Sequence, residues 1–136
     1  MRILSLAAGL LLWPLLATAQ LAVTVSPPKV VGQKAVVPLA MKNNFAEKIA
    51  SARAVVFLLD EQGKMVGQST KWVIGGGRDK PGLAPGATNT FHFVIPTGKP
   101  PTTTNLMAKV SFSRVVLEGG KLADVAKEVS VTAASK

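Results

Sequence analysis

The sequence contains no cysteine. This absence excludes a disulfide framework, cysteine-ligated zinc and a thiol nucleophile. It also excludes the lipid anchor that bacterial lipoproteins carry on a cysteine. A folded domain in this chain must therefore be stabilised by apolar burial and by backbone hydrogen bonds.

Histidine and acidic residues are scarce as well. His92 is the only histidine among 136 residues, and there are seven Asp and Glu. A zinc site needs three or four good ligands, and a calcium loop needs closely spaced carboxylates, so neither is expected. His92 could form a Ser-His-Asp triad with Asp60, Asp79 or Asp124, but no Gly-x-Ser-x-Gly motif accompanies it. We predict a protein that is not an enzyme and has no cofactor, and a hydrolase remains the last alternative.

The N-terminal segment is typical of a secretory signal peptide. A positive start precedes an apolar run over residues 3–16, which is short for a membrane span of about 20 residues. Ala17 and Ala19 place small residues at both positions that signal peptidase reads, so cleavage is expected before Gln20. Loss of residues 1–19 would leave no stable membrane span and an exported protein, periplasmic or extracellular. An uncleaved membrane anchor is the alternative.

Basic residues outnumber acidic ones. Without residues 1–19, fifteen Lys and Arg stand against seven Asp and Glu, which gives 117 residues a formal charge of +8. Such a charge favours anionic partners, although it also serves solubility alone. The basic residues are scattered, and no basic strand is interleaved with aromatic residues, so nucleic acid is not expected. The expected partner is a protein or an envelope component. This partner is anionic if the basic charge serves binding and not solubility alone.

Residues 20–136 read as one all-β domain. Segments rich in valine and threonine alternate between polar and apolar residues, and clusters of Gly, Pro and Asn separate them. No helix is expected. About seven strands in this length predict an antiparallel β-sandwich of the immunoglobulin-like, fibronectin type. The expected strands are 21–25, 35–42, 49–59, 64–74, 88–95, 106–117 and 122–132.

Three positions refine this arrangement. The strand over 49–59 is apolar on both faces, so we expect it to be central and partly covered on both sides. Pro38 cannot donate to a sheet ladder, so its strand is expected at an edge or at a bulge. Arg114 interrupts the alternation of 106–117, which predicts a bulge there or an arginine that extends to solvent.

Two local patterns carry a family resemblance. Residues 56–66 form an apolar strand that ends in Asp, followed by two residues, Gly and a short apolar return. Residues 83–91 read Leu-x-Pro-Gly and then a strand with Phe, and Asn43 or Asn44 ends an earlier strand. Together these patterns resemble the FxLYD-type group of immunoglobulin-like modules of exported bacterial proteins. The resemblance implies an accessory or interaction module and supplies no catalytic residue.

The longest irregular segment, residues 75–87, is the candidate interaction loop, because the loops at the ends of sandwiches commonly bind ligands. It lacks the residue order of a phosphate-binding loop. Trp72 is expected in the core because Ile74 shares its face, and exposure at a binding surface is the alternative. The candidate residues are Trp72, Gly75, Gly76, Gly77, Arg78, Asp79 and Lys80.

We therefore predict an exported, non-enzymatic binding or assembly module that contacts its partner through loops or a sheet edge. The alternative is a structural subunit of an extracellular fibre or complex. In that case residues 21–25, set apart by the prolines at 27–28, would add as a strand to an unpaired edge of another copy and form a homo-oligomer.

Overall fold

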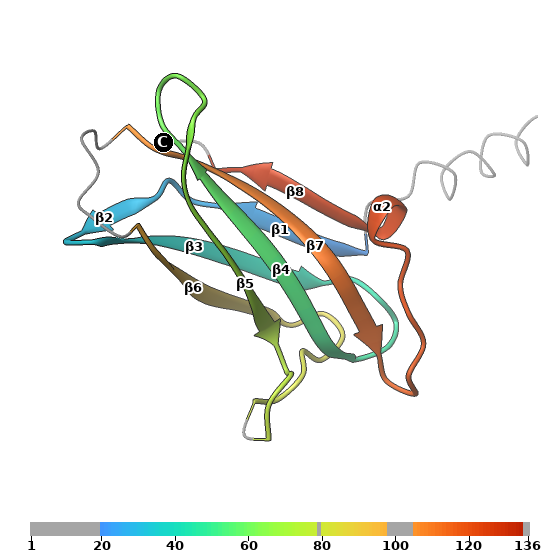
Figure 1. Cartoon of the computed structure of the whole chain (residues 1–136). Helices are drawn as coiled ribbons and strands as arrows, with labels where there is room; N and C mark the ends of the chain where they lie inside the picture. Colours follow the sequence, from blue (N-terminus) through green and yellow to red (C-terminus); the bar gives the residue numbers. More distant parts are fainter. Residues whose placement is uncertain (1–19, 79, 98–104, 135–136) are drawn as a thin grey trace, which may run out of the picture.

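A computed structural model of the chain describes residues 20–78, 80–97 and 105–134 (Figure 1). The described residues are mostly β-strand, arranged in two sheets, so the all-β prediction is confirmed. The elements are β1 (Leu21–Val25), β2 (Lys29–Val31), β3 (Lys34–Asn43), β4 (Ile49–Leu59), β5 (Met65–Ile74), β6 (Thr88–Pro96), β7 (Met107–Leu117), α2 (Val125–Glu128) and β8 (Val129–Ala133).

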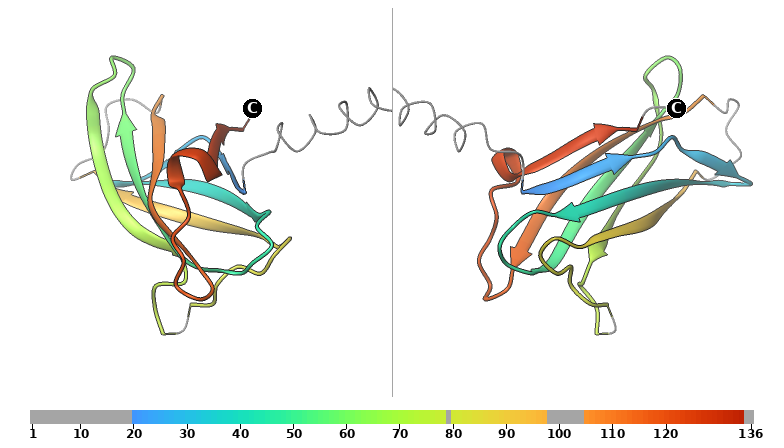
Figure 2. Two further views of the ribbon diagram at one scale, coloured as in Figure 1. Left: turned by 90° about the vertical axis from the view of Figure 1, so that its right-hand side faces the viewer. Right: turned by 180° about the vertical axis from the view of Figure 1, so that it is seen from behind.

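The first sheet has five strands and is built around β3. On one side β3 pairs antiparallel with β1 and β2, and on the other side it pairs with β6. β8 pairs parallel with β1 and ends the sheet. The second sheet has three antiparallel strands in the order β5-β4-β7, and the left view of Figure 2 shows the two layers facing each other.

The core lies between these layers and comes from the inward positions of both. Period-two alternation correctly identified these positions on β3 and β4. Among the described residues, the core extends from Leu21 to Leu117. Residues on β3, β4 and β6 that have no exposed surface include Val37, Leu39, Met41, Ala52, Ala54, Val56, Leu58, Phe93 and Ile95.

The predicted strand over 122–132 is wrong in its first half. Residues Val125–Glu128 form one helical turn, and only Val129–Ala133 is a strand. The Asp124 carboxylate accepts hydrogen bonds from the backbone N–H groups of Ala126 and Lys127, at 3.1 and 3.4 Å. Glu128 Oε1 in turn accepts from the Asp124 N–H at 2.8 Å. This reciprocal cap satisfies backbone N–H groups that would otherwise need partners in a neighbouring strand.

The edge position expected for the strand with Pro38 is also wrong, because β3 is paired on both sides. β1 pairs with β3 as far as Leu39, and β2 takes over at Val36. Pro38 lies at the break between these partners, where its carbonyl accepts from the Ser26 N–H at 3.0 Å. The nitrogen of Pro38, which carries no hydrogen, therefore faces the connection between β1 and β2. Its inability to donate interrupts no row of hydrogen bonds between strands.

The irregularity expected at Arg114 is confirmed as a bulge. The register between β4 and β7 shifts between the pairs Arg53–Arg114 and Ala54–Phe112, so Ser113 is the extra residue. A second shift, between β4 and β5, leaves Val73 without an opposite residue. Both bulges lie at the same end of the three-stranded sheet, and they decide which side chains face outward there.

Candidate binding surfaces

The flank of the molecule beside β5 and β6 is closed. A Cβ on Gly67 would lie 3.2 Å from Ile95 Cγ2 and from the Pro96 carbonyl oxygen, so β5 packs directly on β6. Lys71 crosses from β5 to β6, where its Nζ donates to the Val94 carbonyl at 2.7 Å and lies 5.4 Å from the centre of the Phe93 ring. No room for a ligand strand remains between these two strands.

The opposite flank, beside β7 and β8, is open. The Gly119-Gly120 turn starts a short return along β7, in which Ala123 N donates to Val115 O at 2.9 Å. The chain then forms α2, and β8 pairs with β1 instead of β7. Within the described residues, no backbone partner is recorded on this edge of β7 from Met107 to Ser113. The first part of this edge strand, Met107 to Ser113, therefore has no paired strand among the described residues.

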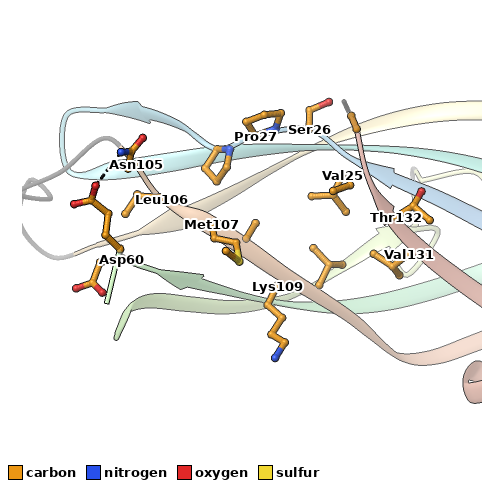
Figure 3. A pocket seen from close by; sticks show the side chains of 16 residues that line it. Val25, Ser26, Pro27, Asp60, Asn105, Leu106, Met107, Lys109, Val131 and Thr132 are labelled. Atoms are coloured by element: carbon orange, nitrogen blue, oxygen red, sulfur yellow. Dashed lines mark hydrogen bonds between the residues drawn. The ribbon is translucent and has the colours of Figure 1, made fainter. Parts of the chain in front are cut away.

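A groove of about 720 Å³ runs beside this unpaired edge, and we call it the β7 groove. Val25 and Pro27 line one side, Leu106 lines the other, and Val131 lies on β8 (Figure 3). Val110 of β7 is also among the lining residues. Lys109 also borders the groove, but its side chain extends away from it (Figure 3). The lining is thus mainly apolar, with Lys109 on the outer rim and the acidic Asp60 and Glu61 also among the lining residues.

The burial of β7 shows what the groove lacks. Ala108 and Val110 face inward, opposite Leu58 and Val56 of β4. The two β4 side chains are fully buried, whereas Ala108 and Val110 are only half-buried. One more strand beside β7 would bury its inward side chains as fully as those of β4.

A second surface is the outer face of the three-stranded sheet. Arg53, Val55, Phe57 and Leu59 of β4 are half-buried and point away from the core. In Figure 1 the three strands form the front layer, and no described element lies before them. The residues in register with these four are Met65, Gln68, Thr70 and Trp72 on β5, and Met107, Lys109, Ser111 and Arg114 on β7.

The expected core position of Trp72 is wrong. Because Val73 is a bulge residue, Ile74 is opposite Ala52 and faces the core, while Trp72 is opposite Arg53 and faces outward. Trp72 is half-buried and is not part of the core. The Arg53 guanidinium carbon lies 5.4 Å from the centre of the indole ring. A strictly period-two pattern cannot foresee this change of face.

The candidate loop is anchored at its start. Gly75 has φ +57°, and a Cβ there would lie 2.0 Å from the Ala50 carbonyl oxygen. A Cβ on Gly76 would lie 2.4 Å from Trp72 Cγ. These glycines therefore serve close backbone packing. Gly76, Gly77, Arg78 and Lys80 are exposed.

Several predicted residues lie outside the described ranges, namely Asp79 in the loop and Ala17 and Ala19 before the predicted cleavage point. Gln20 is described, and its backbone is already hydrogen-bonded: its N–H donates to Glu128 O at 3.0 Å and its carbonyl accepts from Asn44 N at 2.6 Å. None of the described helices is long and apolar enough to cross a membrane.

The structure does not bring His92 together with the acidic residues described. His92 is exposed on β6, opposite Pro38. The Asp60 carboxylate accepts from the N–H groups of Gln62 and Lys64 at 2.9 Å in the β4–β5 turn, and Asp124 caps α2. Among the described residues, no group of three or more metal-ligating side chains is found.

Sequence reasoning missed both surfaces. The unpaired edge of β7 depends on which strand β8 joins, and no local pattern reports that choice. Arg53 and Arg114 were visible as charges within two otherwise alternating strands, and that signal could have directed attention to them. The arginines became candidates only when the register placed them opposite each other.

The fold is that of a protein of two β-sheets around one core. A solved structure, described as that of a candidate ApaA protein from Bordetella pertussis, shares 18% sequence identity with this chain. The similarity covers 77% of this chain and 85% of that chain, with a TM-score of 0.50, and it shows a common fold only. No family model and no curated protein matches the chain, so membership of the FxLYD-type group stays a prediction.

Proposed function

We propose that this protein is an exported, immunoglobulin-like β-sandwich module that binds an extended segment of a partner protein along β7. The observation that carries this proposal is the unpaired edge from Met107 to Ser113 beside the apolar β7 groove. An added strand would obtain backbone hydrogen bonds from the edge and would place alternate side chains in the groove. It would also complete the burial of Ala108 and Val110.

The groove defines the chemistry of the partner segment. Its inward side chains would be apolar, to contact Val25, Val110 and Val131. Its outward face would carry a carboxylate near Lys109. A lysine on an open edge protects against pairing between identical strands, because two copies of β7 side by side would bring their Lys109 side chains close together. The edge therefore favours a different partner over a second copy of this chain, with its carboxylate near Lys109 and away from Asp60 and Glu61, which also line the groove.

Assembly of identical copies by strand addition remains the alternative. It would require the donor strand to leave its own sheet first. The proposed donor, residues 21–25, is paired with β3 on one side and β8 on the other. Leu21 and Val23 are buried in its own core. A copy could donate this strand only by opening its own sheet.

Val110→Asp provides a test of the groove. The matched control is Val36→Asp, because Val36 is also a half-buried strand valine but lies on the far face of the first sheet. A synthetic peptide in which valine alternates with glutamate is titrated into the protein that begins at Gln20. We expect slower amide exchange over 107–113, and binding that Val110→Asp weakens by more than about tenfold, the effect of a charge in an apolar contact.

Unchanged binding by Val110→Asp, or equal loss in both variants, would contradict the assignment of the groove. Light scattering of the protein without peptide provides a further check. A concentration-dependent oligomer that Val110→Asp dissociates would favour assembly of identical copies over a separate partner.

Export is supported by the residues before Gln20, whose pattern is typical of a signal peptide. The expected product in a bacterial host is an exported protein that starts at Gln20. Mass spectrometry of the N-terminus checks this prediction, and a mature protein that retains Met1 would exclude cleavage and replace export with a membrane tether.

A further inference from the structure

We propose that Arg53 and Arg114 form an anion-binding site on the outer face of the three-stranded sheet, and that its ligand is an acidic polypeptide segment. This surface adjoins the β7 groove at Met107 and Lys109, but the inference does not depend on strand addition. It rests on how the two arginines are placed, on what holds Arg53, and on the charges that surround them.

The two arginines are direct cross-strand neighbours. Arg53 of β4 is the register partner of Arg114 of β7. Like charges opposite each other destabilise a sheet, so an acidic residue nearby would be expected to compensate them. The outer face has none: its third charged side chain is Lys109, and its remaining members are apolar or neutral polar residues. The described part of the chain thus leaves the positive charge on this face unbalanced.

Arg53 is held in place from two directions. Its Nε donates to Ser113 Oγ at 3.0 Å, and its guanidinium lies over the Trp72 ring. The ring is supported in turn by the backbone of Gly76, which approaches it too closely for any larger residue. Both terminal nitrogens of Arg53 remain without a recorded acceptor among the described residues. A guanidinium fixed in this way loses little conformational entropy when it binds a carboxylate through two hydrogen bonds.

The surroundings favour a protein as the source of the carboxylates. Val55 and Phe57 continue from Arg53 along β4 as a half-buried apolar stripe, which suits the apolar side chains of a peptide. Arg53 lies over the Trp72 ring, so that face of the indole is not free to stack on a sugar. The acidic turn at Asp60 and Glu61 follows the other end of the same strand, so the carboxylates of the segment would lie at the Arg53 end and its apolar residues toward the turn.

The experiment uses the protein that begins at Gln20, in which Trp72 is the only tryptophan and tyrosine is absent. An oligoglutamate peptide is the probe, and its binding is measured by calorimetry and by the fluorescence of Trp72. We expect binding that changes the Trp72 emission, because the carboxylates pair with the guanidinium over the ring. Arg53→Gln and Arg114→Gln should each weaken binding by about tenfold, the effect of one lost charge-assisted hydrogen bond.

Arg78→Gln is the matched control, because it removes the same charge from the exposed loop next to the sheet. Equal weakening by Arg78→Gln would mean that net charge alone attracts the peptide, and it would overturn the site. Phosphatidylglycerol vesicles and heparin are the comparison ligands. Arg53-dependent binding of either one, without binding of the peptide, would overturn the assigned ligand class. Arg114→Gln leaves the contact between Arg53 and Trp72 intact, so the test stands even if Arg53→Gln impairs folding.

Discussion

Phe93→Ala is expected to lower the free energy of unfolding by about 3–5 kcal/mol, the usual cost of removing a fully buried phenylalanine. Phe93 has no exposed surface and lies on β6, opposite Val37 of β3. Its ring meets that of Phe91 edge to face, with 6.0 Å between the centres. Lys71 Nζ, from the second sheet, lies 5.4 Å from the same ring centre. One side chain thus joins both sheets on the closed flank.

Chemical denaturation of the protein that begins at Gln20 measures this effect, with Trp72 emission as the signal. His92→Ala is the control, because the neighbouring residue of the same strand is exposed and its loss should change the free energy by less than about 0.5 kcal/mol. The free energy of unfolding of natural domains is about 5–15 kcal/mol in total, so Phe93→Ala is expected to remove a large part of the stability. A loss below about 1 kcal/mol would show that the two sheets do not depend on this contact.

Asn43→Asp is expected to have an effect of similar size for an electrostatic reason. Asn43 is the one buried polar residue among those that the structure describes, with 0% of its surface exposed. Its Nδ2 donates to the carbonyl oxygens of Leu83 and Glu47, at 2.8 and 3.0 Å, and its Oδ1 accepts from Phe45 N at 2.8 Å. The amide thereby fastens the loop before β6 to the end of β3.

A carboxylate at this position would face the same two carbonyl oxygens. It carries no N–H group, so it could not donate a hydrogen bond to either of them. An uncompensated buried charge costs about 3–5 kcal/mol, and we expect that loss at neutral pH. Asn44→Asp is the matched control, since the adjacent asparagine is exposed. Thermal and chemical unfolding of both variants provide the measurement. Equal stabilities would contradict a structural role for the Asn43 side chain.

Local patterns were sufficient for most of the strands. On β3 and β4, alternate residues are polar and apolar, and burial of the apolar set is the only way to remove that surface from water. The turn at 60–63 was equally readable, since Gly63 adopts φ +81° and Asp60 binds the backbone N–H groups after it. These features depend on neighbours in the sequence.

The same local reasoning failed where a residue was added or a partner changed. Val73 and Ser113 each shift the register by one position, and a shift of one position exchanges the two faces of a strand. Trp72 was placed in the core for that reason. The cap at Asp124 likewise turned the first half of an expected strand into a helical turn, because a few hydrogen bonds there outweigh weak strand preference.

The sequence alone therefore determined an all-β chain, an N-terminal segment typical of export and the absence of cysteine chemistry, since each follows from composition or from short-range periodicity. Only the tertiary structure located the two surfaces that we propose as binding sites. The β7 groove exists because β8 pairs with β1. The bulge at Ser113 sets the β4–β7 register that places Arg53 opposite Arg114, and the bulge at Val73 places Trp72 opposite Arg53. The pairings of β8 with β1 and of β4 with β7 are long-range, and their free energies depend on the whole set of packed strands.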